Sequence, residues 1–225
     1  MNKSRLTLAT ILIPIMLCTS SCIIHVNAQG EQQDKSSVFG GFSISKERQV
    51  GDLSSINGGI TLQDEVIAKD VSTVNGGIKI GKNVEVSALS TVNGNIKSAE
   101  GLTVQGEVST VNGNIEIQKN SQINNQVSTV NGDITLTTSV VNGDIETTNG
   151  DISLKLATKI AGDIIVKSTN NSWWDSEDNH NNSQTPTLKI DSSSTVEGKI
   201  ILEREVNLQI ESAELLNKVE HNYTK

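Results

Sequence analysis

The sequence predicts an all-β protein built as a single parallel β-helix, a solenoid with about 18 residues in each coil. The motif Gly-x-Ile occurs nine times in the 225 residues, and its fullest copies read Ser-Thr-Val-Asn-Gly-x-Ile. The asparagines of this motif and its close variants recur at steps of 18, 18, 19, 19 and 18 residues, at Asn57, Asn75, Asn93, Asn112, Asn131 and Asn149. Such a short, regular period indicates repeats that pack only on their neighbours.

Within one period, apolar residues mostly alternate with polar ones, as strands require. The coil from Ser72 to Leu89 has its apolar positions at Val74, Ile78, Ile80, Val84, Val86 and Leu89, and the next coil repeats this with Val92, Ile96, Leu102, Val104 and Val108. We expect these side chains to point inward. The chain has only five aromatic residues, so Val, Ile and Leu must form the core.

The Asn-Gly pairs predict corners, because both residues tolerate a positive φ. Asn-Gly also favours hairpins, which would give a meander, but the 18-residue repeat favours stacking of like on like. The residue after each Asn-Gly is Gly, Asn or Asp, which suits a solvated turn (Gly59, Gly77, Asn95, Asn114, Asp133, Asp151). We expect the six stacked asparagines to form an amide ladder along the rod.

Residues 1–28 have the pattern of an export signal and are excluded from the fold. Lys3 and Arg5 precede an apolar run from Leu6 to Leu17 that is too short to span a membrane stably. Thr19-Ser20-Ser21-Cys22 resembles a bacterial lipobox, so we expect lipidation at Cys22 and an outer-membrane lipoprotein. The alternative is cleavage after Ala28, which would give a periplasmic or secreted protein.

The rest of the chain divides by composition. Residues 29–48 are expected to form a tether and an N-terminal cap that includes Phe39 and Phe42, and residues 49–212 the β-helix. A polar insertion at 168–187 interrupts the β-helix as a loop on one face, and residues 213–225 form a C-terminal tail or cap. About 8 coils, spaced by ~4.8 Å, would make a rod about 40 Å long.

Charge limits the partners. The formal net charge is −8, and it becomes −10 when Lys3 and Arg5 are removed with the signal. Such an acidic surface argues against nucleic acid as a partner. The three histidines do not follow the repeat, and no zinc-ligand spacing or phosphate-binding glycine loop is present, so we expect no cofactor and no metal.

Two pairs of residues are candidates for chemistry or binding. Asp133 and Asp151 lie 18 residues apart and should be neighbours at about 5 Å, near the spacing of carboxylates in a retaining glycosidase. A solvated turn explains them as well. Trp173 and Trp174, in the inserted loop, either bind a partner or fold back over apolar surface.

The Ser-Thr-Val-Asn-Gly-x-Ile repeats, the strand after Gly162, the Trp loop and the segment from Val196 to Val206 together resemble a family of exported bacterial β-strand-repeat proteins described as adhesin-like or polymer-forming. The repeat length is also similar to that of bactofilins, which are β-helices that polymerise end to end. The resemblance implies a right-handed β-helix in the cell envelope without catalytic residues. The expected function is a non-enzymatic scaffold or adhesin-like module that associates with itself or with an envelope protein or polysaccharide; the alternative is a polysaccharide-active enzyme that uses the stacked carboxylates.

Overall fold

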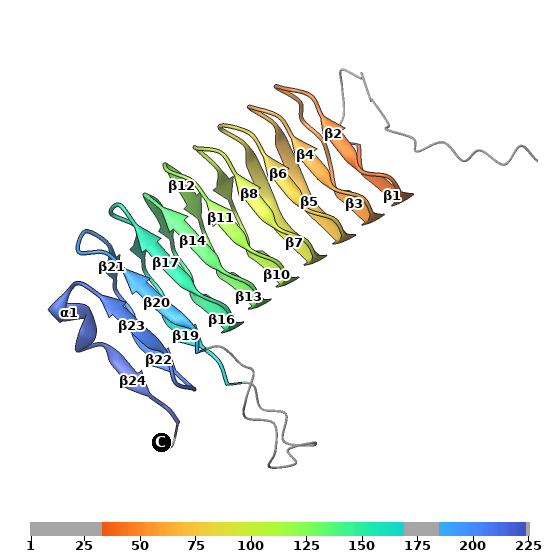
Figure 1. Cartoon of the computed structure of the whole chain (residues 1–225). Helices are drawn as coiled ribbons and strands as arrows, with labels where there is room; N and C mark the ends of the chain where they lie inside the picture. The colour runs from red at the N-terminus through yellow and green to blue at the C-terminus, as the bar shows by residue number, and fades with distance from the viewer. Residues whose placement is uncertain (1–32, 169–184, 224–225) are drawn as a thin grey trace, which may run out of the picture.

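The computed structural model describes residues 33–168 and 185–223, which form a β-solenoid of about 10 turns. Successive coils stack along one axis from β1 and β2 at the N-terminal end to α1 and β24 at the C-terminal end (Figure 1). All paired strands are parallel, so the predicted all-β parallel β-helix is confirmed.

Each regular coil has three sides. Side 1 contains β1 (Lys35–Phe39), β3 (Leu53–Asn57), β10 (Val108–Asn112), β13 (Val127–Asn131), β16 (Ile145–Asn149), β19 (Ile164–Val166), β22 (Ile200–Leu202), β24 (Val219–His221), and the C-terminal halves of β5 (Ile67–Asn75) and β7 (Glu85–Asn93). Side 2 contains β2 (Phe42–Ile44), β4 (Ile60–Leu62), β6 (Ile78–Ile80), β8 (Ile96–Ser98), β11 (Ile115–Ile117), β14 (Ile134–Thr137), β17 (Ile152–Lys155), β20 (Thr187–Ile190) and β23 (Asn207–Ile210). Side 3 contains the N-terminal halves of β5 and β7, with β9 (Thr103–Val104), β12 (Ser121–Ile123), β15 (Ser139–Val141), β18 (Lys159–Ile160) and β21 (Thr195–Val196).

The strand pairing follows the sequence period. Val108 of β10 pairs with Val127 of β13, and Ile115 of β11 pairs with Ile134 of β14, a step of 19 residues in both cases. Because each coil places similar residues in the same register, the interior consists of columns of aliphatic side chains, such as Leu89, Val108 and Val127 on side 1.

The isoleucines of the Gly-x-Ile motif form such a column on side 2. Ile60, Ile78, Ile96, Ile115 and Ile134 are fully buried. Burial of a side chain of this size contributes roughly 1.5–3 kcal/mol. The columns therefore provide a continuous aliphatic core, and among the described residues Phe42 is the only aromatic side chain buried in it.

Side 1 corrects one expectation. Val74 and Val92 were expected to point inward, but each is 39% exposed, whereas Thr73 and Thr91 beside them are buried. Strand alternation from the buried Leu89 explains this arrangement, since residues 89 and 91 share a face that residue 92 cannot share.

The buried threonines are compensated by a repeated hydrogen bond. The hydroxyls of Ser55, Thr73, Thr91, Thr110 and Thr129 each donate to the carbonyl oxygen of the glycine 15 or 16 residues earlier, at 2.9–3.1 Å. Each bond ties side 1 of one coil to the corner of the coil before it. A polar residue is therefore part of the core pattern.

The six repeat Asn-Gly pairs lie at the corner between sides 1 and 2, and positive φ does not explain them, because Gly132 is the one residue among them with a positive φ, at 159°. The non-glycine residues with positive φ in the described ranges instead lie at the corner between sides 2 and 3, and include Glu65, Asn83 and Asn120. The glycines are needed because the stacked corners approach closely. A β-carbon on Gly94 would lie 2.0 Å from the carbonyl oxygen of Gly76, which no side chain can accommodate.

The solenoid has more coils than the eight that the motifs predict, because strands occur on both sides of the range 49–212. β1 and β2 form the first coil, in which Phe42 is buried under the core while Phe39 is 76% exposed. At the other end, α1 (Ala213–Leu216) replaces side 3 of the last coil and buries Leu215, and β24 pairs with β22. These end coils lack the Asn-Gly motif.

Candidate functional site

The six repeat asparagines form an amide ladder at the C-terminal ends of their side 1 strands. The Nδ2 of each asparagine from Asn75 onward donates to the Oδ1 of the asparagine one coil earlier, at 2.9 Å in all five bonds. At the N-terminal end, Asn57 Nδ2 donates to the carbonyl oxygen of Val38 at 3.3 Å. The ladder thus runs in one direction, with every donor facing the N-terminal end of the rod.

The C-terminal end of the ladder is closed by an arginine. Arg204 Nη1 donates to Asn149 Oδ1 at 2.8 Å and to the carbonyl oxygen of Thr148 at 3.1 Å. Thr147 pairs with Val166, and Val166 pairs with Leu202 in the coil after that. Arg204 follows Leu202 by two residues, as Asn149 follows Thr147, so Arg204 occupies the ladder position two coils beyond Asn149. The guanidinium therefore satisfies the last free amide oxygen.

The insertion lies at the corner between sides 1 and 2, in the coil between Asn149 and Arg204. β19 ends at Val166 on side 1 and β20 begins at Thr187 on side 2, so the insertion replaces an Asn-Gly corner. Trp173 and Trp174 lie outside the described residues, as does Cys22. The structure thus describes both points where the insertion joins the solenoid, directly after the ladder ends.

A second row of corner side chains bonds to the backbone. Oδ1 of Asn95, Asn114 and Asp133 accepts the backbone N–H of the corresponding residue one coil later, at 2.8–2.9 Å. Asp151 Oδ1 accepts the N–H of Thr187 at 2.8 Å, across the insertion. Asp133 and Asp151 are therefore neighbours in register, as expected, and each uses one carboxylate oxygen to hold the next coil.

This bonding explains why both amide and carboxylate side chains occur in the second row. The position needs only an acceptor, which both Asn and Asp provide. Both aspartates are exposed, and the corner around them is formed by other turn residues of the stack. The arrangement supports a structural role for the carboxylates without requiring a reaction.

Asp191 holds another corner, between sides 2 and 3. Its carboxylate accepts the backbone N–H of Leu156 in the preceding coil and bonds with Ser193 and Ser194 in its own turn. Burial, the largest influence, raises the pKa of Asp191, but the hydrogen bonds from Ser194, Leu156 and Ser193 together hold that pKa below its ordinary value of 3.8. The carboxylate is thus stabilised in its charged form.

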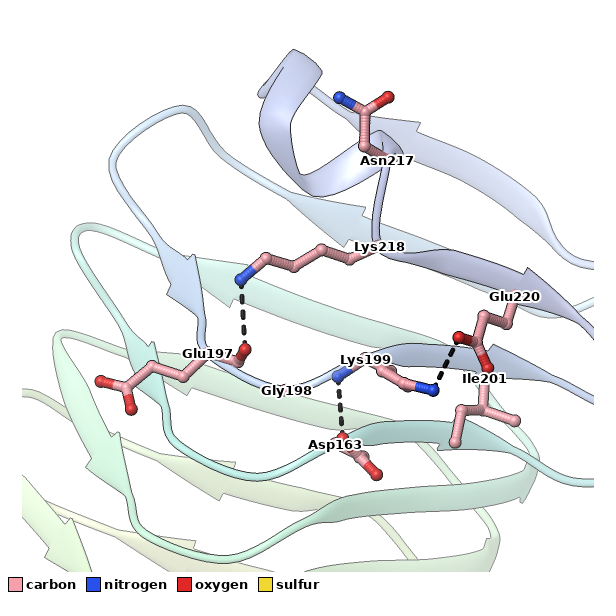
Figure 2. A pocket seen from close by; sticks show the side chains of 8 residues that line it. All are labelled: Asp163, Glu197, Gly198, Lys199, Ile201, Asn217, Lys218 and Glu220. Carbon is pink, nitrogen blue, oxygen red and sulfur yellow. Dashed lines mark hydrogen bonds and ion pairs between the residues drawn. The ribbon is translucent and has the colours of Figure 1, made fainter.

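A shallow hollow lies between the last coils and the C-terminal cap (Figure 2). Lys218 Nζ donates to the carbonyl oxygens of Val196 and Glu197, at 2.6 and 3.2 Å. Lys199 pairs with Glu220 at 2.8 Å, and this hydrogen bond is the main reason that the pKa of Lys199 is raised. Lys218 thus fastens the start of β24 to the end of β21, and Lys199 joins β24 to the start of β22, so the lysines of the hollow hold the cap in place.

The outer surface of side 1 carries a pattern that the sequence analysis missed. One outward column contains Ser36, Ser54, Ser72, Ser90, Ser109 and Ser128, and the next contains Val38, Ile56, Val74, Val92, Val111 and Val130. The second column is 39–54% exposed, and we call it the valine strip. The signal was present in the sequence: once the buried partner of each pair is known to be Thr, Ser and Val must face outward.

Comparisons with protein-family models, with curated proteins and with solved structures found no match to this chain. Among the described residues, no helix is long and apolar enough to cross a membrane. Within the same ranges, no group of three or more His, Cys, Asp and Glu side chains could hold a metal ion.

Proposed function

We propose that the chain is a non-enzymatic cell-envelope protein that acts as a structural scaffold or an adhesin-like binding module. One observation carries the proposal: side 1 presents the same three side chains, Ser, Val and Asn, in consecutive coils of a single rod. A reaction centre needs different groups that converge on one point. A repeated surface instead offers the same weak contact many times, which suits a partner that is itself long or repetitive.

The chemistry of the surface narrows the class of partner. The net charge of −8 disfavours nucleic acid, because a protein binds phosphates through cationic side chains. Outward serines and asparagines offer neutral hydrogen-bonding groups beside exposed valine methyl groups. An envelope protein or a neutral polysaccharide fits such a surface.

The proposed location follows from the N-terminal segment. Export with lipidation at Cys22 would anchor the rod to a membrane, by the outer-membrane lipoprotein route, through the residues before Lys35. Mass spectrometry of the mature N-terminus tests this. A lipidated peptide beginning at Cys22 is expected, whereas an unmodified peptide beginning at Gln29 would refute the anchor and leave a periplasmic or secreted protein.

Binding and turnover distinguish a scaffold from an enzyme. The purified chain is incubated with envelope polysaccharides and with solubilised envelope proteins, and both retention and product release are measured. Retention without product supports the proposal. Product release that is lost in Asp133→Asn or Asp151→Asn would overturn it, and these variants should remain folded because Asn fills the same row at Asn95 and Asn114.

The tryptophans of the inserted loop provide a second test of partner binding. Two exposed indoles could supply much of the buried apolar area of a contact. We expect Trp173→Ala combined with Trp174→Ala to weaken retention of a partner without changing thermal unfolding. Lower stability with unchanged retention would mean that the indoles only cover the solenoid.

A further inference from the structure

The valine strip is more uniform than strand formation requires. The outward position of side 2 also lies in a parallel, in-register column, yet it changes from Thr61 to Lys79, Lys97 and Glu116 in successive coils. Side 2 therefore shows that these coils stack with varied and charged outward residues. The constancy of the valine strip needs another cause.

The strip is also bounded. From β1 to β13 the valine strip and the serine column beside it contain only Ser, Val and Ile, so no ionisable side chain interrupts them. In the next coil the serine column continues as Glu146, which pairs with Lys167 at 2.6 Å. The uncharged surface thus ends where the amide ladder ends, at β16.

We propose that the valine strip is a self-association surface, on which a second copy of this chain packs its own valine strip face to face. The inference goes beyond the proposed function and does not depend on export or lipidation. A second copy carries the same net charge of −8, so most contacts between copies bring like charges together. The uncharged strip avoids this repulsion.

The strip is complementary to itself. A two-fold axis that lies in the plane between the two copies, parallel to side 1, brings the strip of one copy to face the strip of the other, which is the symmetry of an isologous dimer. Two sheet faces pack about 10 Å apart when their side chains interdigitate. Valine methyl groups from one copy would then fill the spaces between the valines of the other, while the asparagine ladders flank the contact.

The area indicates how strong the dimer is. Six strands at ~4.8 Å give a length of about 29 Å, and the width from the serine to the asparagine column is about 12 Å. The face therefore covers about 350 Å² on each copy and about 700 Å² in total, below the 1,200–2,000 Å² of a stable interface. We expect a weak dimer with a Kd on the order of 100 µM to 1 mM.

Sedimentation equilibrium of the full chain in detergent-free buffer, from about 10 µM to about 1 mM, tests the proposal over the range that this Kd sets. The test variant is Val74→Lys combined with Val111→Lys, which places cations at the centre of the strip. The matched control is Val140→Lys, because Val140 is 38% exposed, like Val74, but lies on side 3 in β15. Circular dichroism and thermal unfolding verify that both variants fold.

We expect the wild type and Val140→Lys to dimerise with the same Kd, and the double variant to dimerise at least tenfold more weakly. A wild type that stays monomeric at every concentration overturns the proposal, as does a double variant that dimerises normally. If the wild type stays monomeric and the double variant loses retention of an envelope polysaccharide, the strip binds a glycan and not a second copy. If the wild type dimerises as expected but retains neither an envelope protein nor a polysaccharide, the result contradicts the proposed function and leaves the self-association proposal standing.

Discussion

Thr147 tests whether the buried threonine column is held by its hydrogen bonds. Its side chain is fully buried, and Oγ1 has no hydrogen-bond partner in the described part of the chain. Thr129 lies one coil earlier in the same register and is equally enclosed, but its Oγ1 donates to the carbonyl oxygen of Gly113 at 3.1 Å. The two residues therefore form a matched pair that differs in one bond.

Substitution by valine replaces the hydroxyl with a methyl group of similar size. At Thr147 the change removes a buried, unsatisfied polar group, which costs about 1–3 kcal/mol, so we expect the free energy of unfolding to rise by about 1 kcal/mol. At Thr129 it removes a made hydrogen bond, so we expect a loss of about 1 kcal/mol. With a shift of about 2–4 °C per kcal/mol in a chain of this size, the two melting temperatures should differ by about 4–8 °C.

Far-ultraviolet circular dichroism during thermal and urea unfolding measures both variants against the wild type. Any change in strand propensity from Thr to Val is common to both variants and cancels in their difference. The reasoning is wrong if Thr147→Val lowers stability as much as Thr129→Val does. That result would mean that the hydroxyl at residue 147 is satisfied in solution.

Three further predictions concern the corners. Asn112→Asp should lower the free energy of unfolding by about 1–2 kcal/mol at pH 7, because a carboxylate cannot donate a hydrogen bond along the amide ladder. Asn114→Asp is the control and should change the free energy of unfolding by less than about 0.5 kcal/mol, because the side chain of residue 114 only accepts a hydrogen bond. Urea unfolding of the two variants measures the difference. Arg204→Met should cost about 1–3 kcal/mol by thermal unfolding, since it removes both bonds to the end of the ladder while keeping an apolar stem; no loss would show that the ladder needs no cap. Because the folded pKa of Asp191 lies below the unfolded value, its contribution is present above about pH 4 and is lost as the pH falls through the folded pKa. The stability advantage of the wild type over Asp191→Asn, measured by urea unfolding, should therefore shrink between pH 5 and pH 2, and a constant difference would contradict the assignment.

The sequence alone was enough to predict the register and the ladder. Repeats of 18 or 19 residues can place Gly-x-Ile on Gly-x-Ile only if the coils stack in parallel, and this brings identical asparagines together. Each asparagine has both a donor and an acceptor, so an endless chain of like side chains can bond to itself. The five equal bonds between Asn57 and Asn149 follow from that chemistry.

The direction of the Ser-Thr-Val side chains could not be obtained from hydrophobicity. An apolar residue is expected inside, yet Val74 is exposed and Thr73 is buried. The reason is local: the carbonyl of Gly58 in the preceding coil faces the interior at that level and needs a donor, which Thr73 supplies. Parity counted from Leu89, rather than residue type, would have given the correct assignment.

The number of coils was underestimated from the sequence because the coils at the two ends of the rod lack the repeat motif. The Asn-Gly motif occurs at the corner between sides 1 and 2 only from Asn57 to Asn149, where the amide ladder is continuous, so it does not mark the coils at either end. The first coil presents Phe39 in the ladder register, and the last coils contain Arg204 there. The insertion between Val166 and Thr187 also breaks the 18-residue period before Arg204, so the spacing from Asn149 does not show that Arg204 lies in the ladder register.

The two rows of corner side chains show how the chain assigns amides and carboxylates by function. The first row must donate and accept between side chains, and from Asn57 to Asn149 it contains only Asn. The second row accepts from backbone N–H groups, and it contains Asn95 and Asn114 but then Asp133 and Asp151. Since a carboxylate accepts a hydrogen bond at least as well as an amide does, acidic residues accumulate where only an acceptor is needed. The hydrogen bonds made by Asp133 and Asp151 thus belong to the same stacking that forms the rod, and the uncharged part of side 1, from β1 to β13, is the surface that we propose for a partner.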